Sequence, residues 1–133
     1  MPDDEARPPQ GAVGPGTPVR YTIDIAVDPP RLTPRNVPLG GSDGNFVYQP
    51  ALLRVQADDT ITWTCDHPFT LVFKEGTPIE RIEVFGTPAE GRAGYSTGAF
   101  TVQQVKGHFH YVTAVWKDNR VYMDASCPHI SVN

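Results

Sequence analysis

Two Cys-x-His pairs are the residues of this chain whose types and spacing could bind a metal ion. One pair is Cys65 and His67, and the other is Cys127 and His129. Two thiolates and two imidazoles in a tetrahedral array suit Zn²⁺, or Cu⁺ with its preference for soft ligands. We expect instead two separate, buried and reduced thiols, which is how free cysteines usually occur. A Cys65–Cys127 disulfide is the third alternative.

A further pair of histidines, His108 and His110, stands two residues apart in "GHFHYVTAVW". On an extended strand this spacing places both imidazoles on one face, where they could chelate a divalent metal. Phe109 and Tyr111 take the opposite, core-facing positions. We therefore expect both histidines to face outward, as solvent-facing or sheet-packing side chains, with a surface metal or pH-sensitive contact as the alternative.

The elements that must position these residues are short strands. "VRYTIDIAV" alternates strictly from Val19 to Val27, and this pattern predicts the first strand. Similar signals follow in "NFVYQP", "ALLRVQ", "TITWTC", "FTLVFK", "IERIEVF", "AFTVQQV", "GHFHYVTAVW", "RVYMD" and "HISVN". No window of eleven or more residues shows a helical repeat. Many short alternating strands without a helix predict an all-β antiparallel sandwich or barrel.

The inward positions of these strands predict one hydrophobic core. Its expected members are Ile23, Ile25, Val55, Ile61, Trp63, Leu71, Phe73, Phe100, Phe109, Tyr111, Val115, Ile130 and Val132.

The chain has room for one domain. Residues 1–17 contain almost no large apolar side chains, so we expect a disordered Pro/Gly-rich tail followed by a single domain over residues 18–133. A net charge of −4 favours neither a nucleic-acid nor an anionic-membrane partner. No stretch approaches the roughly 20 apolar residues of a membrane helix. The acidic N-terminus is unlike a secretory signal and indicates a cytoplasmic protein, although a secreted or periplasmic protein would look the same once its signal was removed.

Three segments resemble the cupredoxin (plastocyanin-like) family. "ALLRVQADDTITWT" is similar to the family's strand–turn–strand motif, "GHFHYV" to its Gly-x-Tyr strand, and "ISVN" to its final strand. The resemblance implies a Greek-key β-sandwich. One departure is Asp58, where the family usually has Gly, and Asp tolerates left-handed turn conformations better than most residues.

The resemblance also implies where a type 1 copper site would lie, with two His, one Cys and a weak Met ligand. Phe69 occupies the first His position and Thr113 the Cys position. The second His would fall at Trp116 or Lys117, and the Met near Ser126. Because none of these positions holds its ligand, we expect a copper-free member without a cofactor.

The functional expectation is therefore a non-catalytic binding or accessory/assembly module with an unknown protein or small-molecule partner. No nucleophile elbow, phosphate loop or zinc-protease motif supports an enzyme. The Gly-rich loop from Gly86 to Gly98, with Glu90, Arg92 and Tyr95, is the candidate binding loop. One alternative is a copper- or zinc-handling protein using the two Cys-x-His pairs. Another is a domain that self-associates through a strand edge such as "NFVYQP".

Overall fold

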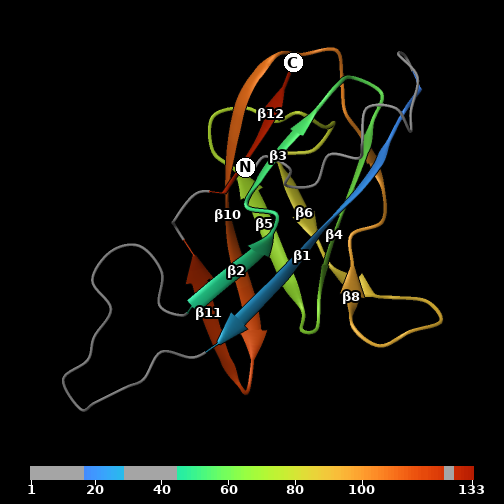
Figure 1. The fold of residues 1–133 in the computed structure, drawn as a ribbon. Helices are drawn as coiled ribbons and strands as arrows, with labels where there is room; N and C mark the ends of the chain where they lie inside the picture. Colours follow the sequence, from blue (N-terminus) through green and yellow to red (C-terminus); the bar gives the residue numbers. More distant parts are fainter. Residues whose placement is uncertain (1–16, 29–44, 125–127) are drawn as a thin grey trace.

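The structure is a computed structural model that describes residues 17–28, 45–124 and 128–133. Within these residues the chain forms twelve strands and no helix. The strands make two six-stranded sheets, neither closed into a barrel (Figure 1). The predicted all-β class is thereby confirmed. The expected disordered tail lies outside the described residues, apart from Thr17.

In the first sheet the strand order is β2-β1-β4-β8-β7, and β9 also pairs with β4. These strands are β1 (Arg20–Asp28), β2 (Asn45–Gln49), β4 (Thr60–Cys65), β7 (Thr87–Pro88), β8 (Tyr95–Ser96) and β9 (Phe100–Thr101).

In the second sheet the order is β3-β12-β10-β5-β6, and β11 also pairs with β10. These strands are β3 (Leu52–Val55), β5 (Phe69–Phe73), β6 (Glu83–Phe85), β10 (Gly107–Lys117), β11 (Arg120–Asp124) and β12 (His129–Val132). The longest strand, β10, is central because it pairs with β5 along one edge and with β12 and then β11 along the other.

Two strand pairings are parallel, so the expectation of a wholly antiparallel fold is wrong at these points. β1 runs parallel to β4, and β3 runs parallel to β12. In both cases the chain passes through other strands before it returns beside its neighbour, which a two-residue hairpin could not achieve. Both sheets are therefore mixed.

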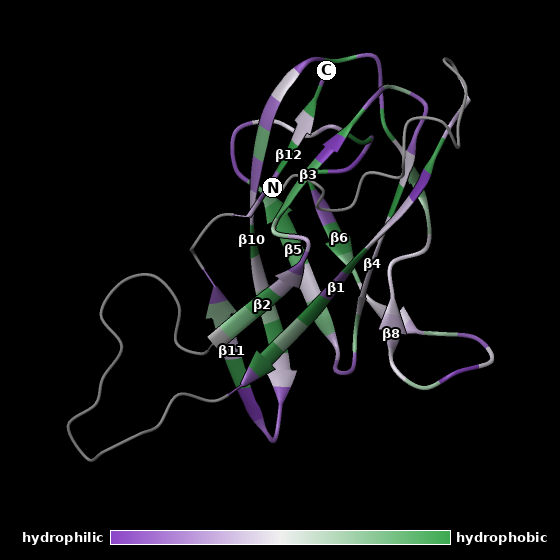
Figure 2. Ribbon diagram, viewed as in Figure 1, coloured by the Kyte–Doolittle hydropathy of each residue, from purple (hydrophilic) through white to green (hydrophobic). Residues whose placement is uncertain are grey.

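Alternation of apolar side chains forms the strands and fills the core. β1 alternates strictly between buried and exposed residues, with Tyr21, Ile23, Ile25 and Val27 facing in. Figure 2 shows the half of this strand nearer the arrowhead mostly in the hydrophobic colour and its other half in hydrophilic and intermediate colours. All expected core residues are buried except two: Phe100 and Phe109 are half-buried and pack against the edge of the core.

The two sheets pack on one another through aromatic side chains. The ring centroid of Trp63, on β4, lies 5.9 Å from that of Tyr111 on β10 and 6.1 Å from that of Phe73 on β5. Both contacts are edge-to-face, the arrangement that aromatic quadrupoles favour. In Figure 1, β1 and β2 accordingly lie across β5 and β10. One core thus serves both sheets.

Candidate functional site

The buried thiol of Cys65 lies at the end of β4. It is a free cysteine whose register partners are Ile25 on β1 and Tyr95 on β8. Burial raises the pKa of this thiol, so it is protonated and weakly nucleophilic at neutral pH. His67 is half-buried in the turn between β4 and β5. The structure therefore shows the expected buried cysteine at this position.

The second Cys-x-His pair is described only in part, because Cys127 lies outside the described residues. His129 begins β12 in the second sheet, whereas Cys65 belongs to the first. Across the described part of the chain, no three or more His, Cys, Asp and Glu side chains are arranged to hold a metal ion. The four-residue metal site stays a prediction.

His129 has neighbours that the sequence did not reveal, namely the other two histidines of the second sheet. His129 is the register partner of His110, and their ring centroids are 4.7 Å apart. The ring of His108, two residues before His110, lies 5.4 Å from that of His129. We call His108, His110 and His129 the histidine cluster. As expected, His108 and His110 are exposed.

Further along β10 the outward-facing residues become apolar. Outward-facing residues of the neighbouring strands lie in line with them across the sheet. Ala114 pairs with Thr70 on β5 and with Met123 on β11, and Thr70 pairs in turn with Phe85 on β6. Residues directly opposite one another in a sheet point to the same face. Phe85 and Met123 therefore end one outward-facing row, and they are 52% and 55% exposed.

Two more large apolar side chains lie in the next outward row of the same face, two residues further along β10. Trp116 on β10 and Val121 on β11 are register partners and are 44% and 39% exposed. We call Phe85, Trp116, Val121 and Met123 the apolar band. Four large hydrophobic side chains on one face of one sheet form a patch, unlike the isolated exposed hydrophobics that every surface has.

The predicted binding loop is largely a hairpin. β7 pairs with β8, and the amide of Ala89 donates a 2.9 Å hydrogen bond to the carbonyl of Gly94. Glu90 and Arg92 are exposed at its tip, whereas Tyr95 is half-buried and packs against the core. The structure therefore gives Tyr95 a packing role and leaves Glu90 and Arg92 available at the surface.

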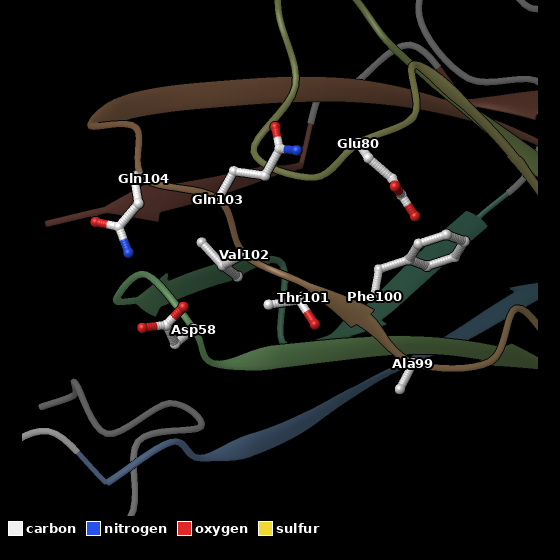
Figure 3. Close-up of a pocket in the computed structure, with 8 residues that line it drawn as sticks. All are labelled: Asp58, Glu80, Ala99, Phe100, Thr101, Val102, Gln103 and Gln104. Atoms are coloured by element: carbon white, nitrogen blue, oxygen red, sulfur yellow. The ribbon is translucent and has the colours of Figure 1, made fainter.

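A hollow of about 550 Å³ lies beside β9 (Figure 3). Asp58 lines it from the β3–β4 turn, Glu80 from the segment between β5 and β6, and Phe100 from β9 itself. Its carboxylates and amides are all exposed. Solvent already satisfies these groups, so the hollow presents no polar group that requires a ligand.

Of the positions that would correspond to copper ligands, Phe69 and Thr113 belong to the core, Trp116 is exposed, and Ser126 lies outside the described residues. Phe69 and Thr113 are both about 2% exposed. Phe69 packs so closely on Gly86 that a Cβ added to this glycine would overlap the phenyl ring. The Lys117 amine donates a 2.9 Å hydrogen bond to the carbonyl of Val27, which links β10 to the first sheet.

Comparison with known proteins adds no relative: no family model, no curated protein and no solved structure matches this chain. Among the described residues, no helix has the length and apolar character needed to cross a membrane.

Proposed function

We propose that this chain is a copper-free, cupredoxin-like Greek-key sandwich that acts as a non-catalytic binding module, with the apolar band as its docking surface for a protein partner. The observation that carries the binding role is the exposure of Phe85, Trp116, Val121 and Met123 on one face of the second sheet.

The arrangement of the family-like segments supports the fold. The strand–turn–strand motif runs from β3 in the second sheet to β4 in the first. The Gly-x-Tyr segment begins β10, and the final segment forms β12, which pairs with β10. These placements are consistent with a two-sheet sandwich in which the last strand lies within a sheet.

The side chains found where the resemblance would place copper ligands support the copper-free state. A blue-copper centre requires a thiolate between two imidazoles. Thr113 offers a hydroxyl and Phe69 a hydrocarbon ring, and both lie buried in the core. These positions contribute packing in place of metal ligation.

The composition of the apolar band supports a protein as its occupant. Aromatic residues and Met are enriched at the centres of protein interfaces, because they bury a large area and Met adapts its shape to the partner. Burying this band would contribute about 25 cal/mol for each Å² of apolar surface removed from water. An open hollow of about 390 Å³ lies at the end of the band, lined by Trp116, Val121 and the turn between them. Because this hollow opens to solvent beside exposed apolar side chains, it suits a side chain that projects from a partner protein.

Site-specific photo-crosslinking in the native host tests this proposal. A photoreactive residue at Val121 should give a discrete adduct, and a Trp116→Ala, Met123→Lys background should abolish it. The matched control places the same residue at Thr22, which is exposed on the first sheet. Equal adducts from both positions, or none from Val121, would contradict the proposal.

Self-association through the edge of β2 is the second candidate function. β2 is the last strand of its sheet, and Val47 on it is 48% exposed. An unpaired strand edge can pair with a second chain. Light scattering over a range of concentrations tests this candidate: a mass that rises with concentration in the wild type but not in Val47→Lys favours self-association through β2, and a monomer at every concentration contradicts it.

A further inference from the structure

Strands β10 and β12 place three imidazoles on one outward face of the second sheet. The antiparallel register sets His110 directly opposite His129, and His108 diagonally from it. The chain has four histidines, so three of them gather in this cluster and only His67 lies elsewhere.

The ring spacings fit a shared metal ion. A zinc ion lies about 2.1 Å from a ligating imidazole nitrogen, and the ring centre lies about 1.2 Å further out. Two rings around one tetrahedral ion therefore have centres about 5.4 Å apart. The centroid separation between His108 and His129, 5.4 Å, equals this value, and the separation between His110 and His129, 4.7 Å, is shorter.

We propose that His108, His110 and His129 bind one first-row transition-metal ion of the Zn²⁺ type. Neutral imidazole suits Zn²⁺, Cu²⁺ and Ni²⁺. The ring planes are inclined by 64° between His108 and His129 and by 39° between His110 and His129. As the rings stand, the nitrogens do not converge on one point. Binding therefore requires rotation about the side-chain bonds of the two exposed histidines, and three ligands would leave a fourth position open to water or a partner's side chain.

The surroundings of the cluster set its protonation and limit its affinity. Partial burial, then the neighbouring His110 and His108, and finally Arg54 on β3 lower the pKa of His129. Lys74 follows β5 on the other side of β10, lines a hollow with His108 and His110, and adds a second positive charge. Arg54 and Lys74 together oppose the charge of a divalent ion.

A carboxylate partly offsets these cations. Glu75 lines a hollow of about 160 Å³ with His108 and His110. Its negative charge favours a cation beside the histidines. No residue of the apolar band takes part in the cluster, so the metal site goes beyond the proposed function and can fail independently of it.

Titration of the metal-free chain, purified without a histidine tag, with Co²⁺ and Zn²⁺ tests the site. We expect one ion per chain, with visible Co²⁺ absorption of four-coordinate intensity. His108→Gln, His110→Gln and His129→Gln should each weaken binding more than about tenfold, since even changes to outer-shell partners cost that much. His67→Gln is the matched control and should leave the affinity unchanged. Circular dichroism confirms that each variant is folded.

Three outcomes overturn the proposal. The first is no binding of either ion to the wild-type chain. The second is binding that survives the three cluster substitutions or is lost in His67→Gln. The third is a thiolate-to-cobalt charge-transfer band in the near ultraviolet, which would assign the ion to a cysteine.

Discussion

The hydroxyl group of Tyr48 donates a 2.6 Å hydrogen bond to Oδ2 of Asp124, 76 residues further along the chain. Tyr48 is on β2 in the first sheet, and Asp124 ends β11 in the second. Asp124 is only 1% exposed. Burial, followed by this hydrogen bond, raises the pKa of Tyr48, so its hydroxyl remains a donor throughout the ordinary pH range. One polar contact thus joins the two sheets inside the core.

Removal of this donor should destabilise the fold. Tyr48→Phe leaves the buried Asp124 without one of its hydrogen bonds, and we expect the free energy of unfolding to fall by about 1.5–3 kcal/mol. Urea denaturation measures the change. Tyr95→Phe, at a half-buried tyrosine, is the control and should change the stability by less than about 0.5 kcal/mol. Equal effects of the two substitutions would show that the Asp124 contact contributes nothing.

Asp58 has a backbone φ of 77°, in the left-handed region. A β-branched side chain is disfavoured there, so Asp58→Val should cost about 1–2 kcal/mol. Asp58→Gly should be nearly neutral, because the relief of strain offsets the extra entropy of the unfolded chain. The control is Asp66→Val, at an exposed aspartate outside the left-handed region. Thermal unfolding ranks the variants. If Asp58→Val lowers the stability no more than Asp66→Val does, the strain argument is refuted.

The hydroxyl of Thr113 is buried near the Tyr48 hydroxyl, whose pKa it lowers, but no residue in the described part of the chain lies in good hydrogen-bond geometry to it. Thr113→Val removes this unsatisfied polar group and keeps the side-chain shape, so we expect a gain of about 1 kcal/mol in the free energy of unfolding. Thr64→Val provides the contrast, because the Thr64 hydroxyl donates to the Asp24 carboxylate. That substitution should destabilise the protein. Loss of stability in Thr113→Val would reveal a partner for this hydroxyl.

Gly86 contacts the Phe69 ring so closely that a Cβ cannot be accommodated without movement. Gly86→Ala should therefore cost about 1–3 kcal/mol, the usual range for overpacking. Because the clash is with the ring, Phe69→Leu combined with Gly86→Ala should lose less than the sum of the two single changes. A double-mutant cycle by chemical denaturation measures this coupling, and strict additivity would contradict the steric explanation.

The raised pKa of the buried Cys65 thiol predicts a loss of stability at alkaline pH. Its unfolded pKa is about 8.5, so the stabilisation is complete below that pH and is lost as the pH rises through the higher folded pKa. Between about pH 8.5 and pH 10, the free energy of unfolding should fall more steeply in the wild type than in Cys65→Ser. Above about pH 10 the unfolded tyrosines also ionise. Parallel slopes below that pH would exclude the thiol as the cause.

Alternation of residues predicted most of the fold. It placed β1 and the inward face of β10 correctly because burial follows side-chain parity within a strand. Phe100 and Phe109 are less buried than expected because they pack at the edge of the core. The hairpin of β7 and β8 was not predicted, because strands of two residues are too short to show an alternating pattern.

Relationships between strands could not be predicted in this way. Parity shows which face a residue takes, but not which strand lies beside its own. The parallel pairing of β3 with β12, the approach of His129 to His110, and the contact between Tyr48 and Asp124 all depend on register between distant segments. The expectation that His108 and His110 face outward was confirmed. That His129 lies beside them could be seen only in the structure.

The position of β12 has a consequence for synthesis of the protein. β12 lies between β3 and β10, near the middle of the second sheet. Since the chain emerges from the ribosome N-terminal end first, this gap stays open until residues 129–132 have left the exit tunnel. Until then β3 has no partner in the second sheet, and the first residues of β10 lack the strand that later pairs with them.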